Sequence, residues 1–139
     1  MRLNGNAKLD LLRSVPLFSG CSGDELVEIS AIAEEVDFPA GKRLIVEGRE
    51  AASEFFAIIE GELLVERGGA DVRRLGPGEW AGEIALVSDV ARTASVTTVT
   101  PVVVLVITRG AFAALLRDSP TIASKVLASL GARLAADAV

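Results

Sequence analysis

Residues 76–96, GPGEWAGEIALVSDVARTASV, interrupt an otherwise regular series of short strands. Within them, residues 82–87 have room for only about one or two turns of helix. Gly82 at the start lets the backbone approach a ligand closely, and free N–H groups at the start of a helix favour an anion. Arg92 follows within a run of small residues, and its guanidinium offers a fixed fork of donors that suits phosphate oxygens. This stretch therefore predicts a site for a phosphate group.

The other polar side chains of the stretch extend this prediction to a nucleotide. Glu83 is a hydrogen-bond acceptor, so its natural partner is a hydroxyl such as a ribose 2′-OH. Thr93 adds a hydroxyl donor beside Arg92, and the residues around them are small and apolar. Two structural alternatives stay open: Arg92 could pair with Glu83 alone at the edge of a core, and Glu83 could be only a favourable charge in a first helical turn.

On both sides of this stretch, from residue 35 to about residue 107, apolar residues recur with a period of two. The expected strands cover residues 36–38, 44–46, 55–59, 63–66, 72–75, 93–99 and 102–107. Many short strands with closely spaced turns indicate an antiparallel sandwich, roll or barrel of about seven or eight strands. Trp80 is expected to pack rather than to stack on a base, and Arg73 and Arg74 to lie on a solvated strand face.

The two ends of the chain have helical patterns. Residues 1–34 predict two short helices joined at a turn that contains Pro16, the second covering residues 24–33 after a cap at Ser22 or Gly23. Residues 109–139 predict one helix over 109–117 and another that begins near Pro120. The apolar stripe of the last helix consists of Ile122, Val126, Leu127, Leu130 and Leu134. The expected order is helices, strands and helices within a single domain over residues 1–139.

Composition limits the function. A chain of 139 residues, half of them hydrophobic, can bury one core, and a net charge of −5 argues against nucleic-acid binding. The sequence has no His and a single Cys, which excludes His-based catalysis, imidazole metal ligands, an internal disulfide and a Cys zinc site. No signal peptide is evident at the start, and the most apolar run, residues 102–107, is too short to cross a bilayer. We expect a cytoplasmic protein with no metal site, no membrane insertion and no enzyme activity.

The motif G-E-I-A-L-x5-R-T-A at residues 82–94 resembles the phosphate-binding cassette of cyclic nucleotide-binding domains, of the type found in catabolite activator protein and protein kinase A regulatory subunits. The resemblance extends over roughly residues 11–134, because VPLFSG at 15–20, FFAIIEGELLV at 55–65 and the turn glycines also match. These glycines are Gly41, Gly48 and Gly61. The sequence departs from the family at Ala81, where an aromatic is common, and at Ala91, where Pro is common.

The resemblance implies an eight-stranded antiparallel β-roll, jelly-roll-like, with N-terminal helices, a short cassette helix and two C-terminal helices. It also implies residue roles. Gly82, Ile84 and Ala85 would present backbone groups, Glu83 would accept from the ribose 2′-OH, and Arg92 would pair with the cyclic phosphate. Thr93 and Ala94 would complete the phosphate cradle, and Leu127, Leu130 or Leu134 would close over the base as a lid.

The implied function is a sensor that binds cAMP or cGMP without catalysis and signals to a protein effector by moving its C-terminal helix. The sequence does not choose between the two nucleotides, and the last helix could also form a homodimer seam. The start at Met1 and the polar tail favour a stand-alone protein over a fragment. The alternative is a degenerate domain with an empty pocket that serves as a protein-interaction or structural module. Both predicted ligand-binding side chains, Glu83 and Arg92, are kept, which counts against degeneracy.

Overall fold

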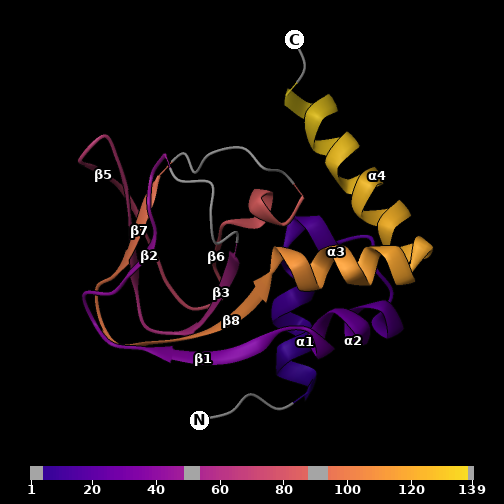
Figure 1. The fold of residues 1–139 in the computed structure, drawn as a ribbon, viewed down its shortest axis with the longest axis horizontal. Coiled ribbons are helices and arrows are strands. Elements are labelled where there is room, and N and C mark those ends of the chain that lie inside the picture. The colour runs from indigo at the N-terminus through magenta and orange to yellow at the C-terminus, as the bar shows by residue number, and fades with distance from the viewer. Residues whose placement is uncertain (1–4, 49–53, 88–93, 138–139) are drawn as a thin grey trace. The chain divides into compact units, whose positions relative to one another are not determined.

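The computed structural model describes residues 5–48, 54–87 and 94–137 (Figure 1). It divides into two compact units. One is the strand unit, Ala33–Arg109, and the other is the helical unit, which combines Met1–Ile32 with Gly110–Val139.

The described residues of the strand unit form eight strands in two four-stranded sheets. The first sheet has the order β1-β8-β3-β6 and consists of β1 (Glu34–Phe38), β8 (Val102–Thr108), β3 (Glu54–Glu60) and β6 (Trp80–Ala81). The second has the order β2-β7-β4-β5 and consists of β2 (Arg43–Ile45), β7 (Ser95–Thr98), β4 (Leu63–Arg67) and β5 (Ala70–Leu75). All strand pairs are antiparallel, and Figure 1 shows β1 and β8 running side by side. The predicted eight-stranded antiparallel β-roll is thus confirmed.

Apolar side chains from both sheets form one core inside the strand unit. Its buried members are Ile45, Phe56, Ile58, Leu63, Leu75, Val96, Val102, Val104 and Val106. Successive side chains of a strand point to opposite faces, so the period of two in the sequence directs alternate residues into this core. The core also fixes the faces of β4, β5 and β7 that carry the candidate site.

Side-chain hydrogen bonds and one glycine hold the turns of the strand unit. Thr98 Oγ1 accepts a hydrogen bond from Lys42 N at 2.8 Å and donates one to Pro39 O at 2.6 Å, which ties the turn between β1 and β2 to β7. Gly61, between β3 and β4, has a φ of 93°, and a Cβ there would lie 2.5 Å from Pro101 O. Only glycine therefore fits this position without rearrangement.

The helical unit contains α1 (Gly5–Arg13), η1 (Pro16–Phe18), α2 (Gly23–Ala31), α3 (Arg109–Asp118) and α4 (Pro120–Asp137). Ser22 caps α2 in a reciprocal arrangement: its Oγ accepts from Glu25 N at 3.2 Å, and its own N donates to Glu25 Oε1 at 2.8 Å. The Phe18 and Phe112 rings are buried within the helical unit and pack against each other with their centroids 5.8 Å apart. The predicted helices and the cap at Ser22 are confirmed.

Two polar contacts join α4 to the N-terminal helices of the same unit. Lys125 Nζ forms an ion pair with Glu25 Oε1, and Ser129 Oγ donates a hydrogen bond to Pro16 O at 2.6 Å. The Lys125 ammonium and the Ser22 backbone N–H hold the pKa of the Glu25 carboxyl down at about 2. Glu25 is therefore ionised at neutral pH although the residue is buried.

The structure also differs from the expected elements at several boundaries. β6 was not expected, because two residues are too few to show an alternating pattern. The strand expected over residues 93–99 is β7, Ser95–Thr98, and residues 88–93 lie outside the described part. The helix expected over residues 24–33 ends at Ala31, where α2 gives way to β1 only a few residues later.

Candidate functional site

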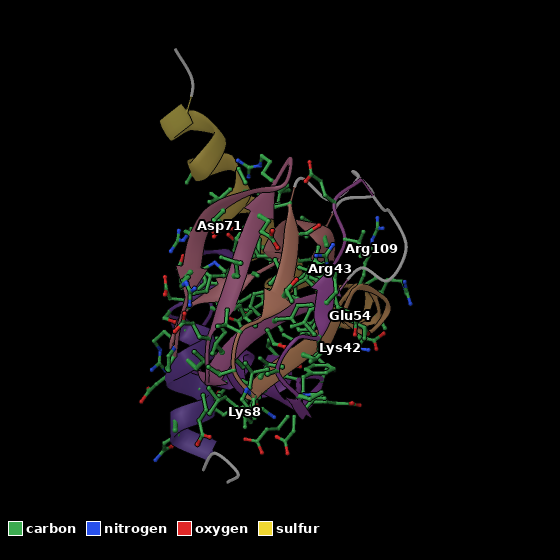
Figure 2. All side chains as sticks on the ribbon, turned by 90° about the vertical axis from the view of Figure 1, so that its left-hand side faces the viewer. Lys8, Lys42, Arg43, Glu54, Asp71 and Arg109 are labelled. Carbon is green, nitrogen blue, oxygen red and sulfur yellow. The ribbon has the colours of Figure 1, made fainter. Side chains whose placement is uncertain are left out.

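The strand unit contains a cavity of about 230 Å³ that opens beside the second sheet. One cross-strand row forms its floor: Ile45 lies opposite Val96, Val96 opposite Val65, and Val65 opposite Arg73. Directly opposed residues of antiparallel strands share a face, and all four line the cavity. In Figure 2 this sheet lies between Asp71 on β5 and Arg43 on β2, which are its outer strands.

The next row on the same face of the sheet is buried, and one of its members, Leu75, also lines the cavity. Leu63 lies opposite both Thr98 and Leu75, and all three are buried. The cavity therefore opens directly from the hydrophobic core and presents an apolar floor with cationic side chains at its edge. Such a hollow suits a small organic anion with one flat apolar part and one charged part.

The first and last residues of the predicted cassette, Gly82 and Ala94, both line this cavity. Gly82 has a φ of 84°, in the left-handed region that favours glycine. The chain then enters η2 (Glu83–Leu86), where Ala85 N donates to Gly82 O at 3.1 Å. The predicted short cassette helix is thus present, as a turn of 3-10 helix anchored by the buried side chains of Ala85 and Leu86.

The structure brings together only part of the predicted site. Glu83 is partly buried, with its Oε2 atom shielded from solvent, but neither Glu83 nor Ala85 lines the cavity among the residues described. Arg92 and Thr93, together with the side chain of Ile84, lie outside the described residues. Their roles stay predictions.

The predicted lid residues are on α4, in the helical unit. Leu127 is 70% exposed and Leu130 is partly buried, and the side chain of Leu134 lies outside the described residues. The apolar stripe expected on α4 is therefore not buried along its whole length. Ile122 and Val126 are buried within the helical unit, whereas Leu127 faces solvent. The lid function stays a prediction.

Besides the apolar residues of its walls, the cavity is lined by two arginines and a tryptophan that were not expected at the site: Arg67, Arg73 and Trp80. The Arg73-Arg74 pair was expected on one solvated face, and both side chains are 59% exposed, but they lie on opposite faces of β5. Arg73 lines the cavity and forms an ion pair with Glu79, whereas Arg74 pairs with Glu62, which raises the pKa of Arg74. Leu75 is buried, and Arg73 comes two residues before it in the same strand. The alternation of side chains along a strand could therefore have placed Arg73 on the same face as Leu75.

No helix in the described part of the chain is long and apolar enough to cross a membrane. Among residues 5–48, 54–87 and 94–137, no group of three or more Cys, Asp or Glu side chains could hold a metal ion.

Comparison with known proteins identifies the family. The sequence model for the cyclic nucleotide-binding domain matches residues 35–119. A CRP-like cAMP-activated global transcriptional regulator of Mycobacterium tuberculosis is 28% identical over 130 residues, which cover 90% of this chain and 58% of that protein. The chain thus spans less than two thirds of this curated relative.

Solved structures agree with this match. The N-terminal domain of a transcriptional regulator from Streptomyces coelicolor superimposes with a TM-score of 0.83 and 28% identity, covering 92% of this chain and 94% of that one. The regulatory domain of Toxoplasma gondii PKA, solved with cAMP, gives a TM-score of 0.71 and 27% identity over 84% of this chain and 47% of that one. By its sequence and by the fold that carries the cassette, the chain belongs to the cyclic nucleotide-binding domain family.

Proposed function

We propose that this chain is a cytoplasmic sensing module that binds a cyclic nucleotide, cAMP or cGMP, in the cavity of the strand unit and performs no catalysis. The observation that carries the proposal is that Gly82 and Ala94, the two ends of the cassette, line one cavity with an apolar floor and cationic edge. A cyclic nucleotide has one negative charge, a ribose hydroxyl and a flat base, and this cavity offers a complement to the charge and to the base.

The cassette supplies the contacts to phosphate and ribose in this proposal. Arg92 and Thr93 immediately precede Ala94 in the sequence, so they belong to the segment that ends at the cavity. Arg92 pairs with the cyclic phosphate, and Thr93 adds a hydroxyl donor. Glu83 accepts a hydrogen bond from the ribose 2′-OH, and the backbone of Gly82, Ile84 and Ala85 surrounds the sugar phosphate. The base lies over the Val65–Val96 floor.

The output of the proposed sensor is a movement of α4 that a protein effector detects. The 70% exposure of Leu127 supports this, because it leaves an apolar side chain of α4 available for contact with the effector. Leu127, Leu130 and Leu134 close over the base as a lid, or the same helix forms a homodimer. The ligand binds one position of α4 more tightly than another, and this difference in affinity shifts the population towards the position that it prefers.

Calorimetric titration with cAMP, cGMP and the control nucleotide 5′-AMP tests the proposal. We expect saturable binding of a cyclic nucleotide and none of 5′-AMP. Arg92→Ala should lose about 2–5 kcal/mol of binding, which is roughly 30-fold or more in Kd. Arg13→Ala is the matched control, since Arg13 is a surface residue of α1 that pairs only with Asp10 three residues away in the described structure. Equal binding by parent and Arg92→Ala would contradict the cassette assignment.

A further inference from the structure

One face of α4 carries two polar contacts to the N-terminal segment of the helical unit. Lys125 Nζ pairs with Glu25 Oε1, and Ser129 Oγ donates a hydrogen bond to Pro16 O at 2.6 Å. Residues four apart in a helix lie on the same face, one turn from each other, so both contacts hold the same side of α4. The Thr121 hydroxyl, one turn earlier, also donates a hydrogen bond to the Glu25 carboxylate. We call the Lys125–Glu25 and Ser129–Pro16 contacts the α4 clasp.

The Glu25 carboxylate makes the clasp costly to break. Its side chain is only 9% exposed, and its Oε1 atom also accepts a hydrogen bond from Ser22 N at 2.8 Å in the cap of α2. A buried carboxylate that loses its cation is left as an uncompensated charge. The Lys125 side chain, in contrast, is 41% exposed, so its ammonium can be rehydrated as soon as α4 moves. The penalty for moving α4 therefore falls mainly on Glu25.

The position of α4 that the clasp holds leaves a predicted lid residue in solvent. Leu127 follows Lys125 by two residues, which places it roughly 200° around the helix. It is 70% exposed, so it is not closed over a base in this position. Figure 1 shows the C-terminal part of α4 extending past the other helices of the unit. Lid closure by Leu127 consequently needs a position of α4 other than the one that the clasp stabilises.

We propose that the α4 clasp is an autoinhibitory contact, which holds α4 in a resting position and has to break before the lid closes over a bound nucleotide. This inference rests on the proposed function. The apparent Kd of a ligand equals its intrinsic Kd divided by the fraction of the protein in the binding-competent state. The clasp lowers that fraction, so a weaker clasp gives tighter binding. Lys125 and Ser129 do not touch the ligand; they set the population of the competent position.

Calorimetric titrations of the full chain with cAMP and cGMP test the clasp. Ser129→Ala removes one hydrogen bond, whose net worth corresponds to a roughly two- to tenfold change in an equilibrium, and should tighten binding by that factor. Lys125→Met keeps an unbranched apolar side chain but removes the ammonium, and should tighten binding by at least as much. Both effects run against the usual result of a substitution, which is weaker binding.

Two further variants sharpen the test. Ser30→Ala is the matched control, because the Ser30 hydroxyl also donates to a backbone carbonyl, that of Val27, but within α2. It should leave the Kd within about twofold of the parent. Glu25→Gln removes the charge, and glutamine serves in a capping box as glutamate does, so the cap of α2 is kept. It should tighten binding as Lys125→Met does, and the double variant should add little, because both changes break the same pair.

Hydrogen exchange of the nucleotide-free chain, followed by mass spectrometry, measures the clasp without a ligand. Amides of α4 around residues 125–130 should exchange faster in Ser129→Ala and Lys125→Met than in the parent and in Ser30→Ala, with the strand unit unchanged. Exchange equal to that of the parent would mean that the clasp does not hold α4, and the inference would be wrong.

The binding results separate this inference from the function on which it rests. If the parent binds a cyclic nucleotide but Ser129→Ala and Lys125→Met bind it equally well or less tightly, the clasp is not autoinhibitory while cyclic nucleotide binding stands. If the parent binds neither cAMP nor cGMP, both proposals are overturned. Ser129→Ala loses a single hydrogen bond, so it keeps the test decisive even if Lys125→Met fails to fold.

Discussion

Replacing Gly61 by Ala should destabilise the strand unit for two separable reasons. The residue has a φ of 93°, and a left-handed conformation costs an L-residue about 1–2 kcal/mol. The new Cβ would also lie 2.5 Å from Pro101 O and 2.9 Å from Val102 Cα, both of them backbone atoms that cannot rotate away. Forcing an extra carbon into such a packed place costs typically about 1–3 kcal/mol more. The total expected loss is about 2–5 kcal/mol.

Gly41→Ala is the matched control for the backbone term. Gly41 has a φ of 79°, but a Cβ there would meet no atom within 4 Å. Only the conformational cost of about 1–2 kcal/mol applies to this variant. The difference in stability between the two variants therefore isolates the close approach of Pro101 to Gly61.

Thermal unfolding followed by circular dichroism or calorimetry measures that difference. For a chain of this length, 1 kcal/mol shifts Tm by about 3–4 °C, so Gly61→Ala should melt about 3–12 °C below Gly41→Ala. Equal melting temperatures for the two variants would refute the argument, because the described packing of the β3–β4 turn against Pro101 would then not exist in solution.

Three further predictions concern the ion pairs and the helix cap. Lys125→Met removes the main contact that lowers the pKa of Glu25, so that pKa should rise from about 2 towards the usual carboxyl range. A lowered carboxyl pKa contributes stability above the unfolded-state value and loses it as the pH falls towards 2. Denaturant titrations between pH 7 and pH 2 should therefore show that the parent loses more stability than Lys125→Met; parallel curves would count against the pair. Ser22→Ala removes the cap of α2 and should cost about 1 kcal/mol by denaturant unfolding, whereas no change would mean that the cap is not formed. Glu79→Gln removes the ion pair with Arg73 and should cost less than about 1 kcal/mol by denaturant unfolding, because both side chains are largely exposed to solvent; a loss of several kcal/mol would contradict this.

Much of the fold could be predicted because its signals are local. The hairpin of β4 and β5, the turn glycines and the cap at Ser22 each depend on a few consecutive residues. β6 could not be predicted, since Trp80 and Ala81 pair with Ala57 and Phe56, more than twenty residues earlier in the chain, and have no pattern of their own. A two-residue strand exists only because the partner strand is already in place.

By itself, the sequence determined the family, because the motif that carries the resemblance lies in nearly consecutive residues, 82–94, and can be recognised without the fold. Gly82 and Ala94 were expected at the site, and both line the cavity. Only the tertiary structure decided which arginine joins them. Arg73 and Arg74 are adjacent, chemically identical and equally exposed, but the register that places Val65 opposite Arg73 puts Arg73 on the face that lines the cavity and Arg74 on the other face. A shift of one residue would exchange them, and that register depends on packing of the whole sheet.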